Sequence, residues 1–96
     1  MTQERVNEIV KSIFGNTYFV EKSKGPGIYK VRHTIGINGA VASGYGCIYD
    51  HGNYLRLLYV WKRDAEPIAN NARAAGFEVT MDYYFDFWVV KVYDNE

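Results

Sequence analysis

Features that define whole classes of protein are scarce or missing in this chain. A single cysteine, Cys47, excludes an internal disulfide and a sulfur-based zinc site, and it fits a reducing compartment. No apolar run approaches the roughly 18 residues that a membrane span requires. Residues 1–5 lack the basic head of a signal peptide. We therefore expect a cytoplasmic protein that does not associate with membranes.

Neither sign of charge is in excess. The 96 residues hold 11 basic and 11 acidic side chains, whereas proteins that coat nucleic acid depend on an excess of cations. Aromatic residues are abundant at 17%, and the hydrophobic fraction of 48% is that of a folded chain. A chain of this length builds one hydrophobic core, so we expect a single compact domain over residues 1–96.

The spacing of apolar residues predicts a helix over residues 3–14, capped by Thr2 and Gly15. A second helix is expected from Asp64, as its N-cap, to Gly76, with a face of small residues that permits close approach to a sheet. The strand-like segments are 17–22, 28–35, 40–49, 54–61, 77–82 and 87–93. This α-β-β-β-β-α-β-β order predicts an α+β fold, an antiparallel sheet of about six strands with both helices packed on one face.

Turn residues indicate how the middle strands pair. Asn38-Gly39 is a two-residue hairpin signal, and residues 50–53 form the next turn. The expected cross-strand pairs are Lys30 with Cys47, Arg32 with Tyr45, Arg56 with Cys47, and Tyr54 with Tyr49. The core side of these strands is then expected to hold Tyr29, Val31, His33, Gly44, Gly46, Ile48, Leu55, Leu57, Tyr59 and Trp61.

The last two strand segments are expected to form a hairpin around the four residues Tyr83-Tyr84-Phe85-Asp86. Apolar side chains on one side and opposite charges on the other favour one register. Its pairs are Phe77 with Val92, Val79 with Val90, Met81 with Trp88, and Glu78 with Lys91.

The sheet face away from the helices is the clearest functional signal. Its expected partner-binding residues are Lys30, Arg32, Tyr45, Tyr49, Tyr54 and Arg56. Tyrosine and arginine dominate binding hot spots. Tyr83, Tyr84 and Phe85 are added as partner-binding residues, because a hairpin tip offers aromatic rings little core to enter. The alternative for both groups is structural: the tyrosines would pack on arginine stems, and Phe85 would fold back over the sheet end.

Chemistry-bearing motifs are not recognisable. Cationic neighbours would activate Cys47 as a nucleophile, but His33 is expected on the opposite face and His51 in a turn. A metal site requires three or four converging ligands, and the glycines of residues 36–46 match no phosphate-binding loop. We therefore expect no cofactor, no metal and no enzymatic activity.

Three functions from different classes remain. The first is a protein-interaction module, the alternative is a sheet that binds single-stranded nucleic acid, and the third is a small enzyme using Cys47. Homodimerisation is compatible with each. In size and composition the chain is similar to the small inhibitors that phages and mobile elements encode against host defence, including anti-CRISPR proteins. That resemblance implies an inhibitor of a host protein.

Overall fold

The helices and strands of the computed structural model, which describes residues 1–35 and 40–95, follow the predicted order. They are α1 (Gln3–Phe14), β1 (Tyr18–Lys22), β2 (Ile28–Ile35), β3 (Ala40–Asp50), β4 (Tyr54–Tyr59), α2 (Lys62–Ala74), β5 (Glu78–Tyr84) and β6 (Phe87–Tyr93). The strands form one antiparallel sheet in the spatial order β1-β2-β3-β4-β6-β5. The predicted α+β class is therefore confirmed.

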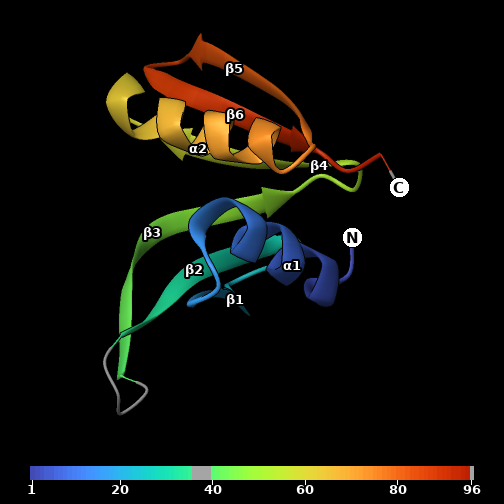
Figure 1. The fold of residues 1–96 in the computed structure, drawn as a ribbon, viewed down its shortest axis with the longest axis vertical. Coiled ribbons are helices and arrows are strands. Elements are labelled where there is room, and N and C mark those ends of the chain that lie inside the picture. Colours follow the sequence, from blue (N-terminus) through green and yellow to red (C-terminus); the bar gives the residue numbers. More distant parts are fainter. Residues whose placement is uncertain (36–39, 96) are drawn as a thin grey trace.

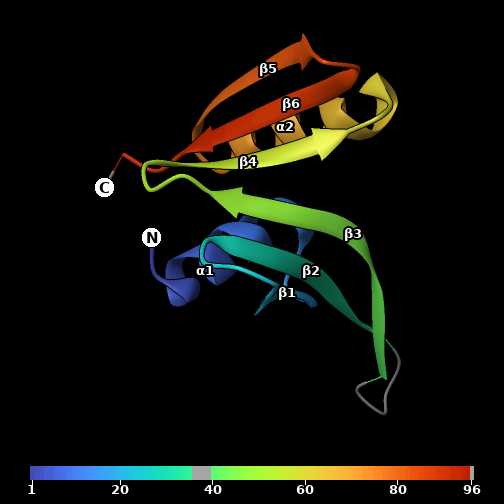
Figure 2. The same cartoon turned by 180° about the vertical axis from the view of Figure 1, so that it is seen from behind.

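Both helices cover the same face of the sheet. α1 packs on β1, while α2 packs on β4, β5 and β6 (Figure 1). In the reverse view the strands lie in front of the helices (Figure 2). Neither described helix has the length and hydropathy of a membrane-spanning segment. The other side of the sheet, which we call the open face, is left without a covering element among the described residues.

The two helices begin in different ways. In α1 the Thr2 hydroxyl accepts a hydrogen bond from the Arg5 amide at 3.1 Å, as predicted for an N-cap. α2 starts three residues earlier than predicted, with Trp61 rather than Asp64 at the N-cap position. The carbonyl of Trp61 accepts from the amides of Asp64 and Ala65 at 3.1 and 3.2 Å, so Asp64 lies inside the first turn of the helix. Trp61 is 58% exposed, which corrects its predicted place in the core.

The core lies between the helices and the covered face of the sheet. Val31, Ile48 and Leu55 are almost completely buried there, as the predicted alternation requires. The small-residue face of α2 meets them through Ala65 and Ala69. Gly46, also predicted on the core side, is exposed like Trp61, and His33 and Tyr59 are half-buried. The other predicted core residues of β2, β3 and β4 whose burial the structure describes are buried.

The β2–β3 register agrees with the prediction only near one end. Lys30 pairs with Cys47, but a bulge follows, and Arg32 then pairs with Ser43 rather than Tyr45. Gly46, opposite this interruption, has a φ of 79°, which glycine adopts without strain. The predicted Asn38-Gly39 turn lies outside the described residues, and so does the side chain of Tyr45.

The other two predicted registers are wrong by two residues. Tyr49 pairs with Arg56, so Arg56 is not beside Cys47. In the last hairpin Glu78 pairs with Tyr93 instead of Lys91, and the remaining pairs shift with it. The reason is a shorter turn: only residues 85 and 86 lie between the paired strands, and both have positive φ, 48° and 67°. Such a two-residue turn extends each strand beyond the four-residue turn that we predicted.

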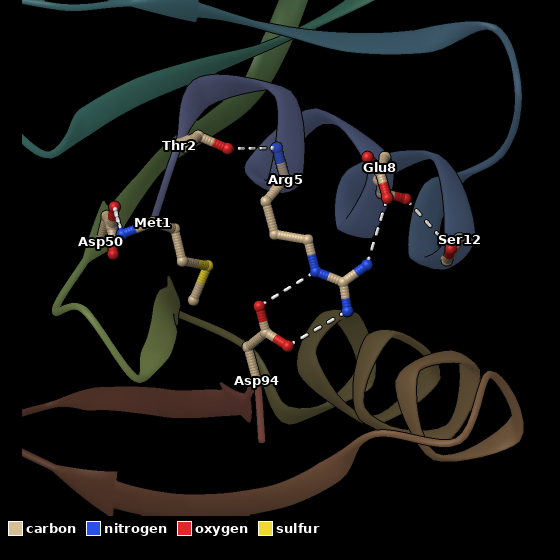
Figure 3. A network of polar contacts seen from close by, with 7 residues as sticks. All are labelled: Met1, Thr2, Arg5, Glu8, Ser12, Asp50 and Asp94. Atoms are coloured by element: carbon tan, nitrogen blue, oxygen red, sulfur yellow. Dashed lines mark hydrogen bonds and ion pairs between the residues drawn. The ribbon is translucent and has the colours of Figure 1, made fainter. Parts of the chain in front are cut away.

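An ion-pair network fixes α1 against the ends of the sheet (Figure 3). The Nε and Nη2 atoms of Arg5 donate to the two carboxylate oxygens of Asp94, just after β6, at 3.0 and 3.1 Å. The amino group of Met1 lies 3.0 Å from the carboxylate of Asp50 at the end of β3. Bidentate pairing of this kind restricts geometry as well as adding energy, so the network holds the β3 and β6 ends in place.

Candidate functional site: the open face and the hairpin tip

The centre of the open face holds two cations side by side. Tyr49 of β3, Arg56 of β4 and Lys91 of β6 are successive cross-strand partners. Directly opposite residues in an antiparallel sheet have their Cβ atoms about 5 Å apart, and like charges there oppose folding. Arg56 and Lys91, which we call the cation pair, therefore contribute a local repulsion to the fold.

Tyrosine rings hold both members of the cation pair. The guanidinium carbon of Arg56 lies 4.9 Å from the Tyr49 ring centroid. The ammonium nitrogen of Lys91 lies 5.2 Å from the ring of Tyr54, which in turn packs on Tyr93 at 5.3 Å. These contacts are favourable but supply no counter-charge. No carboxylate among the described residues forms an ion pair with either cation, and the Nε of Arg56 is buried without a hydrogen-bond partner.

The other predicted basic residues of the face lie toward β1. Arg32 donates to the carboxylate of Glu21 at 3.1 Å, so its charge is matched within the fold. Lys30 is exposed, with Glu21 and Cys47 as its cross-strand neighbours. The structure thus brings Tyr49, Tyr54 and Arg56 together, and it separates Lys30 and Arg32 from them.

Of the two cations that the sequence placed beside Cys47, the structure confirms Lys30 but not Arg56. Cys47 is half-buried opposite Lys30, and Arg56 belongs to the next row. The imidazole of His33 stacks on Tyr18 at 4.1 Å. The ring of His51 stacks on Tyr54 at 4.7 Å. Each histidine therefore has its own aromatic partner, and neither is placed as a base for the thiol.

The β5–β6 hairpin ends in four exposed aromatic residues, which we call the aromatic tip. They are Tyr83, Tyr84, Phe85 and Phe87. Phe85 is 78% exposed and touches the ring of Tyr84 edge-on at a centroid distance of 4.3 Å. It does not fold back over the sheet end, which removes the structural explanation considered for it. Its φ of 48° lies in the left-handed region that a bulky residue rarely adopts.

An apolar cross-strand pair on the open face lies between the cation pair and the aromatic tip. Leu58 and Val89 are cross-strand partners one row beyond the cations. Val89 is only 9% exposed although it points away from the helices and lies outside the main core cluster. Tyr84 and Phe87 form the last pair of the hairpin on the same side. A partner could therefore contact charge, aliphatic surface and aromatic rings in one direction along β6.

A cleft of about 710 Å³ opens on the helix-covered side, between the end of α1, α2 and the end of β4. Phe14, Tyr59, Trp61 and Ile68 are among the side chains that line it. The hydroxyl of Tyr59 is buried without a hydrogen-bond partner. Burial is the main reason that the pKa of Tyr59 is raised above its ordinary value near 10. This hydroxyl therefore stays protonated throughout the neutral range.

Sequence reasoning missed two members of this surface. Lys91 was predicted to pair with Glu78, and the pairing of β4 with β6, which places Lys91 beside Arg56, was not predicted. Phe87 was counted only as the start of a strand, although it follows three aromatic residues and an acidic one. Placing the turn at residues 85 and 86 would have added Phe87 to the tip, but a phenylalanine in that position runs against turn preferences.

Among residues 1–35 and 40–95, no three histidine, cysteine or carboxylate side chains gather in a way that could hold a metal ion. Comparisons with protein-family models, with curated proteins and with solved structures found no match. The functional proposal consequently depends on the geometry of this surface alone.

Proposed function

We propose that this chain is a non-enzymatic protein-interaction module that docks through the aromatic tip and the adjoining open face. The observation that carries the proposal is Phe85, which is both 78% exposed and held at positive φ. A residue in a sparsely populated backbone region destabilises the fold by about 1–3 kcal/mol and marks a candidate functional position. An exposed aromatic ring gives little stability in return, so a binding role explains its presence at the turn.

The tip has the physical properties of a docking anchor. Aromatic rings contribute large contact area while few torsions become fixed on binding. The two-residue turn and the pairing of Tyr84 with Phe87 already order the tip, which lowers the entropy lost on association. An inhibitor that covers a surface of a cytoplasmic host protein, such as a phage-encoded anti-defence protein, is the specific form of the proposal that we favour.

Affinity capture from the native host lysate tests this proposal. We expect the wild-type chain to retain a partner that Phe85→Ala loses. Trp61→Ala is the matched control, because Trp61 is also an exposed aromatic residue but lies outside the tip. Retention by Phe85→Ala and loss by Trp61→Ala would instead place the partner at the cleft beside β4 and refute docking through the tip.

Binding of single-stranded nucleic acid is the second candidate, favoured by the tyrosines and cations of the open face. Bases would stack on Tyr49 and Tyr54 while Arg56 and Lys91 contact phosphates. Binding to a phosphate backbone depends on many cations, and this face brings only two close together, so we rank this function second. Titration of a labelled oligothymidylate at two salt concentrations tests it: a steep loss of affinity with salt supports the function, and no binding at low salt excludes it.

A further inference from the structure

We infer that the cation pair is a binding site for carboxylate groups of an acidic protein segment. This inference rests on the proposed function, because it names the chemistry of the partner that the open face receives. Its starting point is that Arg56 and Lys91 are direct cross-strand neighbours with no acidic partner among the described residues. A carboxylate placed between them would replace a repulsion with two attractions.

The surroundings of Arg56 support a specific anion site rather than a diffuse positive surface. The Tyr49 ring fixes the guanidinium, and the buried Nε–H lacks an acceptor. Because the fold covers Nε, the terminal amino groups of Arg56 are the donors that an incoming carboxylate can contact. The ring of Tyr54 holds the Lys91 ammonium in the same way. Both donors are therefore positioned before a partner arrives.

The rest of the open face indicates what must accompany the carboxylates. From Lys91, β6 passes the apolar pair of Val89 and Leu58 and reaches Phe87 four residues away, a distance of about 13 Å along a strand. A matching segment carries one or two acidic residues and, about four residues further in extended conformation, an apolar side chain. Glu78 and Asp82 of β5 border the face, so negative charge is accepted only at the cation pair. A protein segment with one or two carboxylates fits this arrangement better than a phosphate backbone, whose charges recur along its whole length.

An extended hexapeptide with two amino-terminal glutamates and a carboxy-terminal leucine is a suitable probe, with its two-glutamine counterpart for comparison. We expect the glutamate peptide to shift the Nε–H signal of Arg56 in ¹⁵N-resolved NMR spectra and to bind about tenfold more tightly than the glutamine peptide. Lys91→Gln should reduce its affinity about tenfold, Lys91→Arg should retain it, and Lys24→Gln should leave it unchanged. Lys24 is an exposed lysine in the β1–β2 connection, so it controls for net charge.

Thermal unfolding of the free variants gives a second, independent measurement. Lys91→Gln removes a like-charge contact together with the ring contact to Tyr54, so its thermal midpoint should equal that of the wild type or exceed it by up to about 4 °C. That result also shows that weak peptide binding by Lys91→Gln does not reflect misfolding. A variant that is less stable than the wild type would mean that Lys91 serves the fold, and it would overturn the inference.

Other outcomes separate this inference from the proposed function. Equal affinity for the two peptides, with an unmoved Arg56 signal, would overturn the carboxylate site. The docking proposal would survive that result if the signals of Tyr84 and Phe85 still shifted. Salt-sensitive binding of oligothymidylate, tighter than that of the glutamate peptide, would assign the cation pair to phosphates and overturn the inference in favour of nucleic acid.

Discussion

Replacing Phe85 with asparagine should stabilise the protein while it removes partner binding. Phe85 occupies the first of two central turn positions with φ of 48°, where a residue with a side chain loses about 1–2 kcal/mol relative to the right-handed region. Asparagine tolerates this conformation because its short amide bonds to the local backbone. The exposed ring loses only its edge contact with Tyr84, worth at most about 1 kcal/mol. We expect a net gain of about 0.5–1 kcal/mol in the free energy of unfolding.

The matched variant Phe85→Ala separates the ring from the backbone, because alanine removes the ring but keeps a Cβ atom in the strained conformation. In a domain of this size a gain of 1 kcal/mol raises the thermal midpoint by about 4–8 °C. The midpoint of Phe85→Asn should thus rise by about 2–8 °C, measured by circular dichroism, while that of Phe85→Ala stays at or below the wild-type value. Equal midpoints for the two variants would refute the reasoning, since they would show that the turn stores no strain.

Three further substitutions test other parts of the fold. Asp94→Asn removes the charge that two N–H groups of Arg5 contact, so urea unfolding should show that the free energy of unfolding falls by about 2 kcal/mol. A fall below about 0.5 kcal/mol would show that this ion pair does not stabilise the fold. Tyr59→Phe should leave the neutral-pH stability equal or slightly higher, because the lost hydroxyl has no partner. The raised pKa of Tyr59 means that the folded state binds this proton more tightly than the unfolded state, so wild-type stability should fall above about pH 10 more steeply than in Tyr59→Phe; identical alkaline unfolding curves would contradict this. Gly27→Ala, at a φ of 75° and with its new Cβ 3.1 Å from the carbonyl oxygen of Asp50, should lower the thermal midpoint by about 4–8 °C, and an unchanged midpoint would show that the loop adjusts freely.

Side-chain alternation made the two faces of the sheet predictable even where the register was not. Each register error was a shift of two residues, and two is also the period of a strand. Tyr49, Tyr54 and Arg56 therefore lie on the predicted face, and Leu55 and Leu57 lie in the predicted core. The shift changed the identity of the cross-strand neighbours. The cation pair could not be foreseen because it depends on the pairing of β4 with β6, two strands separated by α2 and β5 in the chain.

The turns and caps were less predictable because the residues that occupy them are not the ones that such positions usually favour. The last turn uses a left-handed phenylalanine, so residue preferences pointed to a longer loop. A bulge at Gly46 interrupts β3, but the glycine-rich segment around it gave no unique position for the interruption. α2 begins at a tryptophan without a side-chain cap, although Asp64 offered a better one in sequence. Tertiary packing decided each of these cases.

Two departures from local stability rules fall on one continuous surface. Phe85 strains its turn, and Lys91 lies directly opposite Arg56. Lys91 belongs to β6, the strand that also carries Phe87 of the aromatic tip. A single substitution would relieve either one: Phe85→Asn relaxes the backbone, and Lys91→Glu would create an ion pair. Proteins keep such destabilising groups where activity requires them, since stabilising replacements are readily available elsewhere. If the surface had no partner, nothing would explain why both departures lie on it. A variant carrying Phe85→Asn and Lys91→Glu would then gain stability and keep the same partner capture and peptide binding as the wild type.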